Sequence, residues 1–232
     1  MYLRSIITKN ASEKTKAVKR AIEKSIRLTI NDIFRGGITL PVSVSGRIDC
    51  GSVQVGDVLL DMPTGEKAAV KAIEVDEEPK DWAVAGHNVV LHLAGIEIDH
   101  LKYVPCPFKL VSLSNSQPRQ GDILCDLNHP VPAVSLINLK VLSFESITPM
   151  MVDIHRGRLD APGRITRLIA TYDKATGALI KKKPRHIPAG SLASIQVEVV
   201  GGTIPVETSN RIVLRAFGQT VAAGLVEDQP VV

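Results

Sequence analysis

The sequence predicts an all-β protein built from two consecutive small antiparallel β-barrels, with a short N-terminal helix or tail. Three observations favour this class. Hydrophobic residues make up 44% of the 232 residues but aromatic residues only 3%, so the core should consist of Val, Ile, Leu and Ala, a composition that favours strands. From residue 25 onward, apolar and polar residues alternate with a period of two. Gly and Pro turns separate these segments, as in small closed barrels.

The first barrel is expected over residues 25–127, after an N-terminal tail of residues 1–24 in which 12–24 form a marginal helix. Strands are indicated by "SIRLTINDIF", "VSVSGRI" and "NVVLHLAGI", in which every second residue is apolar. The segment "DVLLDMPTGEKAAVKAIEV" holds two strands around a turn at Pro63-Thr64-Gly65. Residues 103–119 form an irregular insert with three prolines, and we expect poor order there, from Tyr103 to Pro118.

This insert is either a genuine surface loop or a translated intron. Lys102-Tyr103-Val104 can be encoded with the fungal-type donor GTATGT, Ser114-Asn115 with the branch sequence CTAAC, and Arg119 with an acceptor AG. Removing the segment would keep the reading frame and join Lys102 to Gln120. The genomic and transcript sequences at this point distinguish the two explanations.

The second barrel is expected over residues 128–232, after a linker near residues 128–132 that carries two prolines. Its strands are indicated by "SLINLKVLSF", "GRITRLIATYD", "ALIKKKPRH", "SLASIQVEVV", "RIVLRAF" and "TVAAGLV". In "SLASIQVEVV" we expect Ala193, Ile195, Val197 and Val199 to face one way and the intervening residues the other.

Several kinds of chemistry are not indicated. The sequence contains no phosphate-binding GxxxxGK[ST] loop and no GxSxG motif, and its six histidines are scattered. We therefore expect no catalytic residue, metal site or cofactor in this chain. The three cysteines suggest no disulfide framework, and the longest apolar runs are too short to span a bilayer. Trp82 is expected to pack near a turn. The net charge of +4 is compatible with an anionic partner such as ribosomal RNA.

The first barrel carries a recognisable run of residues: Gly46, Arg47, Asp49, Gly51, Gly56 and Asp57. Together with the flanking "SGRIDCGSVQVGDVLLDM", it resembles the second domain of the elongation-factor-Tu-like translational GTPases. We interpret these residues as a structural turn motif, in which Gly51 and Gly56 allow tight bends and Asp57 hydrogen-bonds turn amides.

The second barrel narrows the resemblance. "TYDKATGALIKKKPRHIPAGSLASIQVEV" and "RIVLRAFGQTVAAGLV" resemble the third domain of the HBS-one-like ribosome-rescue GTPase that partners Pelota, and fungal members in particular. The resemblance covers about residues 17–228. It implies a cytoplasmic, monomeric module that acts in rescue of stalled ribosomes and mRNA surveillance. The family's GTP-binding domain, which would hold GTP and Mg, has no counterpart here, so this chain is expected not to be an enzyme.

The resemblance also suggests binding residues. The segment "RIVLRAFGQT" would present Arg211, Val213, Arg215 and Gln219 to a Pelota-like paralogue of release factor one. The alternative is that these arginines are simply solvated, with their stems covering apolar surface.

A second basic cluster comprises Lys181, Lys182, Lys183 and Arg185, with Arg156, Arg158, Arg164 and Arg167 upstream. It could approach ribosomal RNA of the small subunit, or be solvated. Because alternate residues of a strand point apart, not all of these lysines should share a face.

Two other functions stay open. The barrels could belong to an elongation factor one-alpha or release factor three relative that grips aminoacyl-tRNA or a release factor. The chain could also be a truncated regulatory decoy that competes for Pelota. Copurification of tRNA or of a termination factor would indicate the first of these functions. An upstream reading frame that encodes a phosphate loop would exclude the second.

Overall fold

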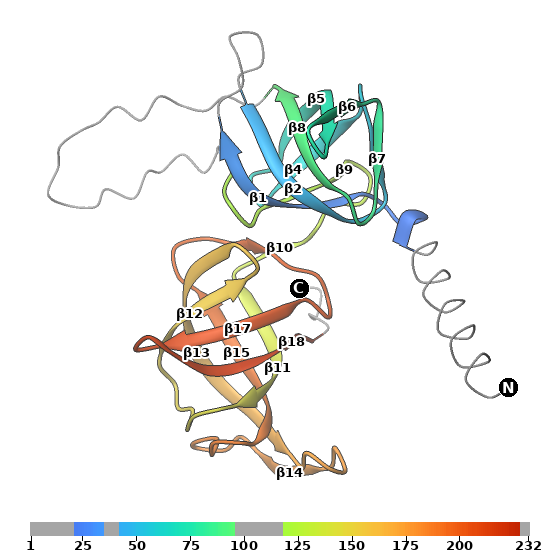
Figure 1. Ribbon diagram of the computed structural model, residues 1–232. Coiled ribbons are helices and arrows are strands. Elements are labelled where there is room, and N and C mark those ends of the chain that lie inside the picture. Colours follow the sequence, from blue (N-terminus) through green and yellow to red (C-terminus); the bar gives the residue numbers. More distant parts are fainter. Residues whose placement is uncertain (1–20, 35–41, 96–117, 228–232) are drawn as a thin grey trace, which may run out of the picture. The chain divides into compact units, whose positions relative to one another are not determined.

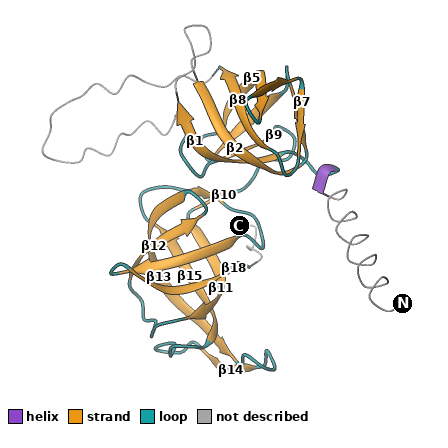
Figure 2. Ribbon diagram, viewed as in Figure 1, coloured by secondary structure: helices purple, strands orange, loops and turns teal. Residues whose placement is uncertain are grey.

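The computed structural model describes residues 21–34, 42–95 and 118–227. Within them the fold is all β, as predicted, and helix is confined to Ala21 and Ile22 (Figure 2). The chain divides into two compact units, Met1–Pro130 and Val131–Val232, and each contains one barrel (Figure 1). Most of the expected N-terminal helix and almost all of the 103–119 insert lie outside the described residues.

The first barrel is a closed ring of six antiparallel strands in the order β4-β9-β1-β2-β8-β5, which the pairing of β4 with β5 closes. The strands of the ring are β1 (Arg27–Phe34), β2 (Val42–Cys50), β4 (Val58–Met62), β5 (Glu66–Val75), β8 (Asn88–Ala94) and β9 (Ile123–Asp126). A short strand, β6 (Glu78–Lys80), pairs antiparallel with the end of β5 outside the ring. Strand β3 (Ser52–Gln54) pairs with β7 (Trp82–Val84). Closure leaves the ring without a free strand edge.

The interior of this barrel follows the predicted alternation. In β1, Leu28 and Ile30 are fully buried, whereas the alternate residues Arg27 and Thr29 are partly exposed. The same pattern holds in β8, where Val89, Leu91 and Leu93 point inward. Burying an aliphatic side chain of this size contributes about 1.5–3 kcal/mol. The hydrophobic core, rather than any polar network, therefore holds the ring together.

The second barrel has the same architecture, with strand order β12-β17-β18-β11-β15-β13 closed by the pairing of β12 with β13. Its strands are β11 (Leu136–Ser143), β12 (Met151–Arg156), β13 (Leu159–Tyr172), β15 (Leu192–Val199), β17 (Arg211–Ala216) and β18 (Gln219–Val226). β14 (Leu179–Lys182) extends β13 as a protruding hairpin, and β10 (Ala133–Val134) pairs with β16 (Ile204–Pro205).

Within β15 the predicted inward row is confirmed, because Ala193, Ile195, Val197 and Val199 are all buried. Ser194, on the opposite face, is also buried; its hydroxyl donates to Glu227 Oε1 at 3.1 Å. This bond satisfies a polar group that would otherwise be costly to bury.

Strand β12 was not predicted from the sequence. Its inward positions are Val152, Ile154 and Arg156, and all three side chains are buried. Because the third inward position is an arginine, only two apolar residues, Val152 and Ile154, alternate in the sequence of this strand. Two residues are too few to predict a strand. The burial of Arg156 also removes it from the exposed basic cluster that the sequence suggested.

Aromatic side chains are kept out of both cores. No Phe, Tyr or Trp occurs among the buried residues in the described parts of the chain. The prediction that Trp82 packs near a turn was wrong, because its side chain is 62% exposed. In β7 the inward position belongs to Ala83, which is fully buried, so the pleat directs Trp82 outward.

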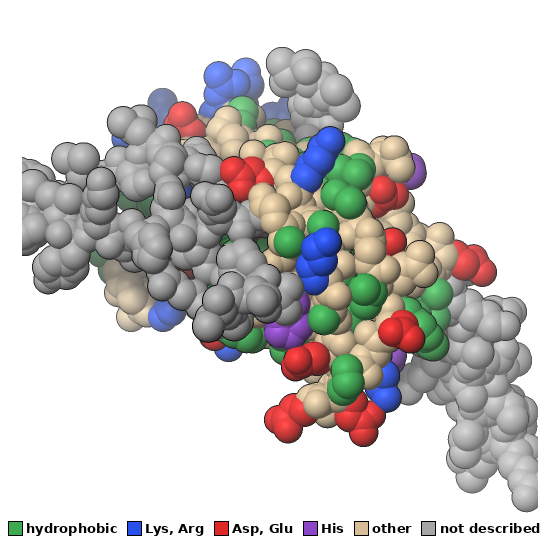
Figure 3. Space-filling view, turned by 90° about the horizontal axis from the view of Figure 1, so that it is seen from above, with side chains coloured by type: hydrophobic (Ala, Val, Ile, Leu, Met, Phe, Trp, Pro, Cys, Tyr) green, Lys and Arg blue, Asp and Glu red, His purple; other side chains and the backbone are tan. Residues whose placement is uncertain are grey.

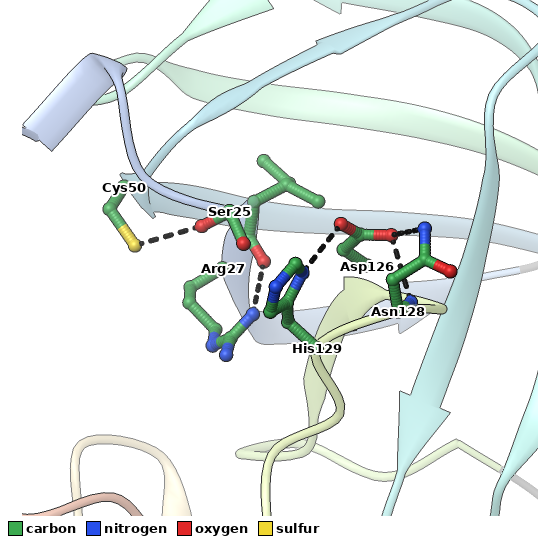
Figure 4. A network of polar contacts seen from close by, with 7 residues as sticks. Ser25, Arg27, Cys50, Asp126, Asn128 and His129 are labelled. Atoms are coloured by element: carbon green, nitrogen blue, oxygen red, sulfur yellow. Dashed lines mark hydrogen bonds and ion pairs between the residues drawn. The ribbon is translucent and has the colours of Figure 1, made fainter.

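The segment that follows the first barrel is shaped by one carboxylate (Figure 4). Asp126, the last residue of β9, accepts hydrogen bonds from the backbone N of Asn128 at 3.1 Å and from its Nδ2 at 3.4 Å. His129 Nδ1 lies 3.2 Å from the other carboxylate oxygen. The bonds from Asn128 and then His129 lower the pKa of Asp126. The linker therefore starts as an Asx-type turn.

Asp61, in β4, is a buried carboxyl group without a charged partner. Its Oδ2 accepts a hydrogen bond from Thr64 Oγ1 at 2.8 Å, and its Oδ1 has no hydrogen-bond partner among the described residues. Burial raises the pKa of Asp61 from 3.8 to about 6, despite the opposing bond from Thr64. The folded chain thus binds a proton more tightly than the unfolded chain between these two values.

Replacing Asp61 with Asn is expected to flatten the pH dependence of stability. In the wild type, the contribution of Asp61 is fully present below about pH 4 and is lost as pH rises through about 6. At ~1.4 kcal/mol per pKa unit, the loss is on the order of 3 kcal/mol. Urea unfolding at pH 4, 5, 6 and 7 should show the variant equal to the wild type at pH 4 and more stable at pH 7. A variant that is less stable at pH 7 would contradict this interpretation.

Candidate partner-binding surface

The outward face of β17 carries three side chains that we call the docking row: Arg211, Val213 and Arg215. They alternate with Ile212 and Leu214, whose side chains are buried in the second barrel's core. Both arginines are exposed and Val213 is partly exposed. The period of two and the buried alternate residues fix the direction of the row.

The neighbouring strands add mixed side chains to this face. On β18, Leu225, Ala223 and Thr220 lie opposite Arg211, Val213 and Arg215 respectively. On β12, Asp153 lies opposite Arg215, and His155 lies opposite Val213. Leu225 is exposed although it is apolar. The surface around the docking row is therefore part of the outer wall of the barrel, with apolar residues between charged ones.

The two arginines of the docking row make few polar contacts within the described part of the chain. Arg215 donates from one guanidinium nitrogen to the carbonyl oxygen of Gly218 at 2.8 Å, within the same hairpin. Among the described residues, neither Arg211 nor Arg215 makes an ion pair. His155, beside the row, lies 3.6 Å from Asp160. Both guanidinium groups therefore remain accessible to an acidic partner, although Asp153 lies opposite Arg215 on the neighbouring strand.

The turn that joins β17 to β18 places the fourth predicted residue, Gln219. Phe217 and Gly218 form a two-residue loop in which both have positive φ, 52° and 78°, as a type I′ hairpin turn requires. Gln219 follows as the first residue of β18, opposite Ala216, and is exposed. The structure thus brings Gln219 to the tip of the hairpin whose strand β17 carries the row.

Only some residues of the basic cluster at and after β14 lie on one surface of the second barrel. An open groove, which we call the basic groove, is lined by Asn138, Arg167, Leu168, Ile169, Ala170, Tyr172, Leu179, Lys182, Lys183 and Gln196. Lys182 and Lys183 line it, but Lys181 and Arg185 do not, in keeping with the expectation that the lysines do not share one face. The lining contains three cations and no acidic residue.

Tyr172 and Arg167 were not singled out together from the sequence. Both line the groove along the C-terminal half of β13, where Arg167 lies opposite Gln196 of β15. Lys140 Nζ lies 5.1 Å from the centre of the Tyr172 ring, a cation–π distance. The odd spacing of Arg167 and Tyr172 predicts opposite faces of a regular strand. The register shift between Leu168 and Ala170, which the sequence does not show, changes this alternation.

The turn motif of the first barrel is built from local geometry. Asp57 Oδ2 accepts a hydrogen bond from the backbone N of Gln54 at 2.9 Å, and Asp49 Oδ2 accepts one from Thr29 Oγ1 at 2.7 Å. Gly51 and Gly56 have φ values of +81° and +97°. The remaining two members, Gly46 and Arg47, lie in β2 between β1 and β8, with Arg47 exposed.

The rest of the surface offers weaker candidates. Trp82 lines a second open groove, together with two cations, Lys71 and Lys80, but also with Asp81. Lys80 already pairs with Glu78 at 2.7 Å. On the face shown in Figure 3, Lys and Arg side chains alternate with acidic and hydrophobic ones, and the coloured residues form no continuous basic surface.

In the described ranges, no three His, Cys, Asp or Glu side chains come together as a metal site would require. No helix in those ranges is long and apolar enough to cross a membrane.

Comparisons with known proteins agree with this architecture. Residues 141–227 match the family described as GTP-eEF1A C-terminal domain-like. The chain is 30% identical over 220 residues to "Elongation factor 1 alpha-like protein" of Schizosaccharomyces pombe, covering 90% of this chain and 33% of that protein. It is 26% identical over 223 residues to "Protein HBS1" of Drosophila melanogaster, covering 92% and 31%.

Solved structures show the same fold. A crystal structure of sup35 complexed with GDP matches with a TM-score of 0.75 and 22% identity, over 90% of this chain and 48% of that one. The chain thus spans about a third of the two relatives and about half of sup35. The chain is therefore similar, over about nine-tenths of its length, to elongation factor 1-alpha-like proteins, and it shares its fold with part of sup35.

Proposed function

We propose that this chain is the partner- and ribosome-binding module of a cytoplasmic translational GTPase that acts with a Pelota-like protein to rescue stalled ribosomes. The observation that carries the proposal is the docking row, an outward strand face with two arginines that make no ion pair among the described residues. The similarity to Drosophila protein HBS1 supports the choice of partner class.

The docking row suits a protein partner. Because β17 lies inside a closed ring, its outward side chains need little reordering on binding, which reduces the entropic cost of association. Arginines can pair with partner carboxylates in a bidentate manner, and arginine is enriched at binding hot spots. The apolar Val213 and Leu225 between them would be covered by the same partner.

Binding and hydrolysis of GTP would belong to a separate domain of a full-length protein. GTP and Mg²⁺ would be bound by the GTP-binding domain of a full-length member, and hydrolysis there would release the partner. The chain by itself is proposed to bind no nucleotide and to hydrolyse no GTP. Its role would be to hold the partner and to touch the small ribosomal subunit.

Binding of the purified chain to three candidate ligands tests the proposal. Isothermal titration calorimetry would compare a Pelota-like protein, a class-one release factor and an aminoacyl-tRNA under the same conditions. We expect the Pelota-like protein to bind most tightly. Tighter binding of the release factor or of tRNA would instead favour the elongation- or termination-factor function, and the rescue assignment would be discarded.

A ribosomal RNA contact through the basic groove is the second part of the proposal. Three cations around Tyr172, without an acidic neighbour in the lining, suit a phosphate backbone with an exposed base. The groove, rather than the whole run from Lys181 to Arg185, would make this contact.

Reversing two groove charges, Lys182→Glu with Lys183→Glu, is expected to weaken binding to small-subunit ribosomal RNA and to lower the salt slope by roughly 2. Fluorescence anisotropy at several salt concentrations measures both effects. Lys67→Glu with Lys71→Glu, on the first barrel, changes the net charge equally and serves as the control. Equal losses in the two double variants would show a general charge effect and no groove.

A further inference from the structure

The tip of the β17–β18 hairpin carries a costly residue. The Phe217 side chain is 97% exposed, and its backbone φ is +52°. A large apolar ring in water is unfavourable, and a bulky residue in the left-handed region is a backbone outlier. Exposure and backbone strain are therefore both unfavourable at Phe217, and a residue such as Asn would form this turn with less strain.

Nothing in the described part of the chain compensates for these costs. The ring makes no aromatic or cation–π contact there, and its exposure leaves no room for a packing partner. Asn at this position would tolerate positive φ and, before Gly218, would form the Asn-Gly pair that type I′ turns prefer. A strained and exposed residue of this kind points to a function outside the chain.

The surroundings of the tip indicate what such a partner offers. Because Asp153 pairs with Arg215, the antiparallel register brings Met151, at the start of β12, to the same end of the hairpin as Phe217. Met151 is 51% exposed, and it lies opposite Arg164, which is also exposed. Together with Arg215, Arg164 places a second arginine near the apolar tip, and Asp153 lies opposite Arg215. Arg211 lies at the other end of β17, opposite Leu225.

We propose that Phe217 is the anchor by which the second barrel engages its protein partner. The ring enters an apolar pocket on the partner, and Met151 covers the pocket's edge. Acidic side chains around the pocket face Arg164 and Arg215. The partner is a Pelota-like protein, so this inference rests on the proposed function and names the residue that carries it.

The composition of the tip favours a protein over a nucleic acid. An RNA ligand could stack one base on Phe217, but its phosphate backbone would leave the exposed Met151 against a polar chain. Protein interfaces instead combine aromatic residues, Met and Arg at their centres.

The decisive variant is Phe217→Asn, which keeps the turn and removes the ring. We expect its melting temperature to rise, because the strain and the exposed ring disappear, while affinity for the Pelota-like protein falls roughly thirtyfold, as for a hot-spot residue. Differential scanning calorimetry and isothermal titration calorimetry measure the two effects. Ile180→Asn, at an exposed position of β14, is the matched control and should leave affinity unchanged.

Each outcome distinguishes this inference from the proposed function. If Phe217→Asn binds the Pelota-like protein as the wild type does, the anchor is refuted and the proposed function stands. A lower melting temperature would show that the ring supports the fold, which also refutes the anchor. If the wild type binds tRNA and no Pelota-like protein, the proposed function fails, and the protein anchor fails with it.

Discussion

Gly51→Ala is expected to destabilise the first barrel by more than about 3 kcal/mol. The φ of +81° at this position is unfavourable for alanine, and a Cβ atom would lie 2.5 Å from Ile26 Cα and 2.8 Å from the carbonyl oxygen of Lys24. These are backbone atoms, which cannot move aside cheaply. The resulting shift would also weaken the bond from Gly51 N to Ala21 O, now 2.7 Å long.

Gly56→Ala is the matched control within the same turn motif. Its φ of +97° is also strained for alanine, but no atom lies within 4 Å of the added Cβ. We expect a cost of about 1–2 kcal/mol, from the backbone alone. Urea unfolding followed by fluorescence of Trp82, the single tryptophan, reports on the first barrel. Equal costs at the two positions would mean that close backbone approach is not what Gly51 provides.

The double variant Arg211→Glu with Arg215→Glu is expected to lower affinity for a Pelota-like protein at least about a hundredfold. It replaces two attractive charges with two repulsive ones on a rigid strand. The core-building alternate residues are untouched, so the fold should persist. Stability should fall modestly, because Arg215 loses its bond to the carbonyl oxygen of Gly218 and a glutamate there faces Asp153. The affinity loss should shrink at high salt, since part of it is screened Coulomb repulsion.

The control for this variant reverses two cations on another strand of the same barrel, Lys181→Glu with Lys182→Glu. Surface plasmon resonance would give the rate and equilibrium constants of both. We expect the control to keep its affinity within about threefold, an effect of net charge alone. Unchanged binding of the Arg211 and Arg215 variant would remove the docking row from the interface.

Much of the fold could be predicted because the inside of a closed barrel imposes a period of two. Segments such as 192–199 show it directly, and the turn at Pro63-Thr64-Gly65 separates β4 from β5 as expected. The pattern failed at β12, where the inward Arg156 interrupts it. It failed again at Trp82, because a three-residue strand gives too little alternation to assign a face.

The candidate surfaces were less predictable, since they depend on register and backbone conformation. The outward direction of Arg211 and Arg215 follows from alternation along one strand. The basic groove, in contrast, needs the pairing of β13 with β15, which includes two register shifts. The exposure and positive φ of Phe217 depend on a two-residue turn, which the letters "AFGQ" do not specify alone.

Photo-crosslinking from the hairpin tip tests the central claim most directly. p-Benzoylphenylalanine would be introduced in place of Phe217, with the same group in place of Ile180 on β14 as the control. In a mixture of a Pelota-like protein, a release factor and tRNA, we predict an adduct of the Pelota-like protein from position 217 and none from position 180. An adduct with tRNA, or equal yields from both positions, would contradict the claim that this hairpin is the docking site for a protein partner.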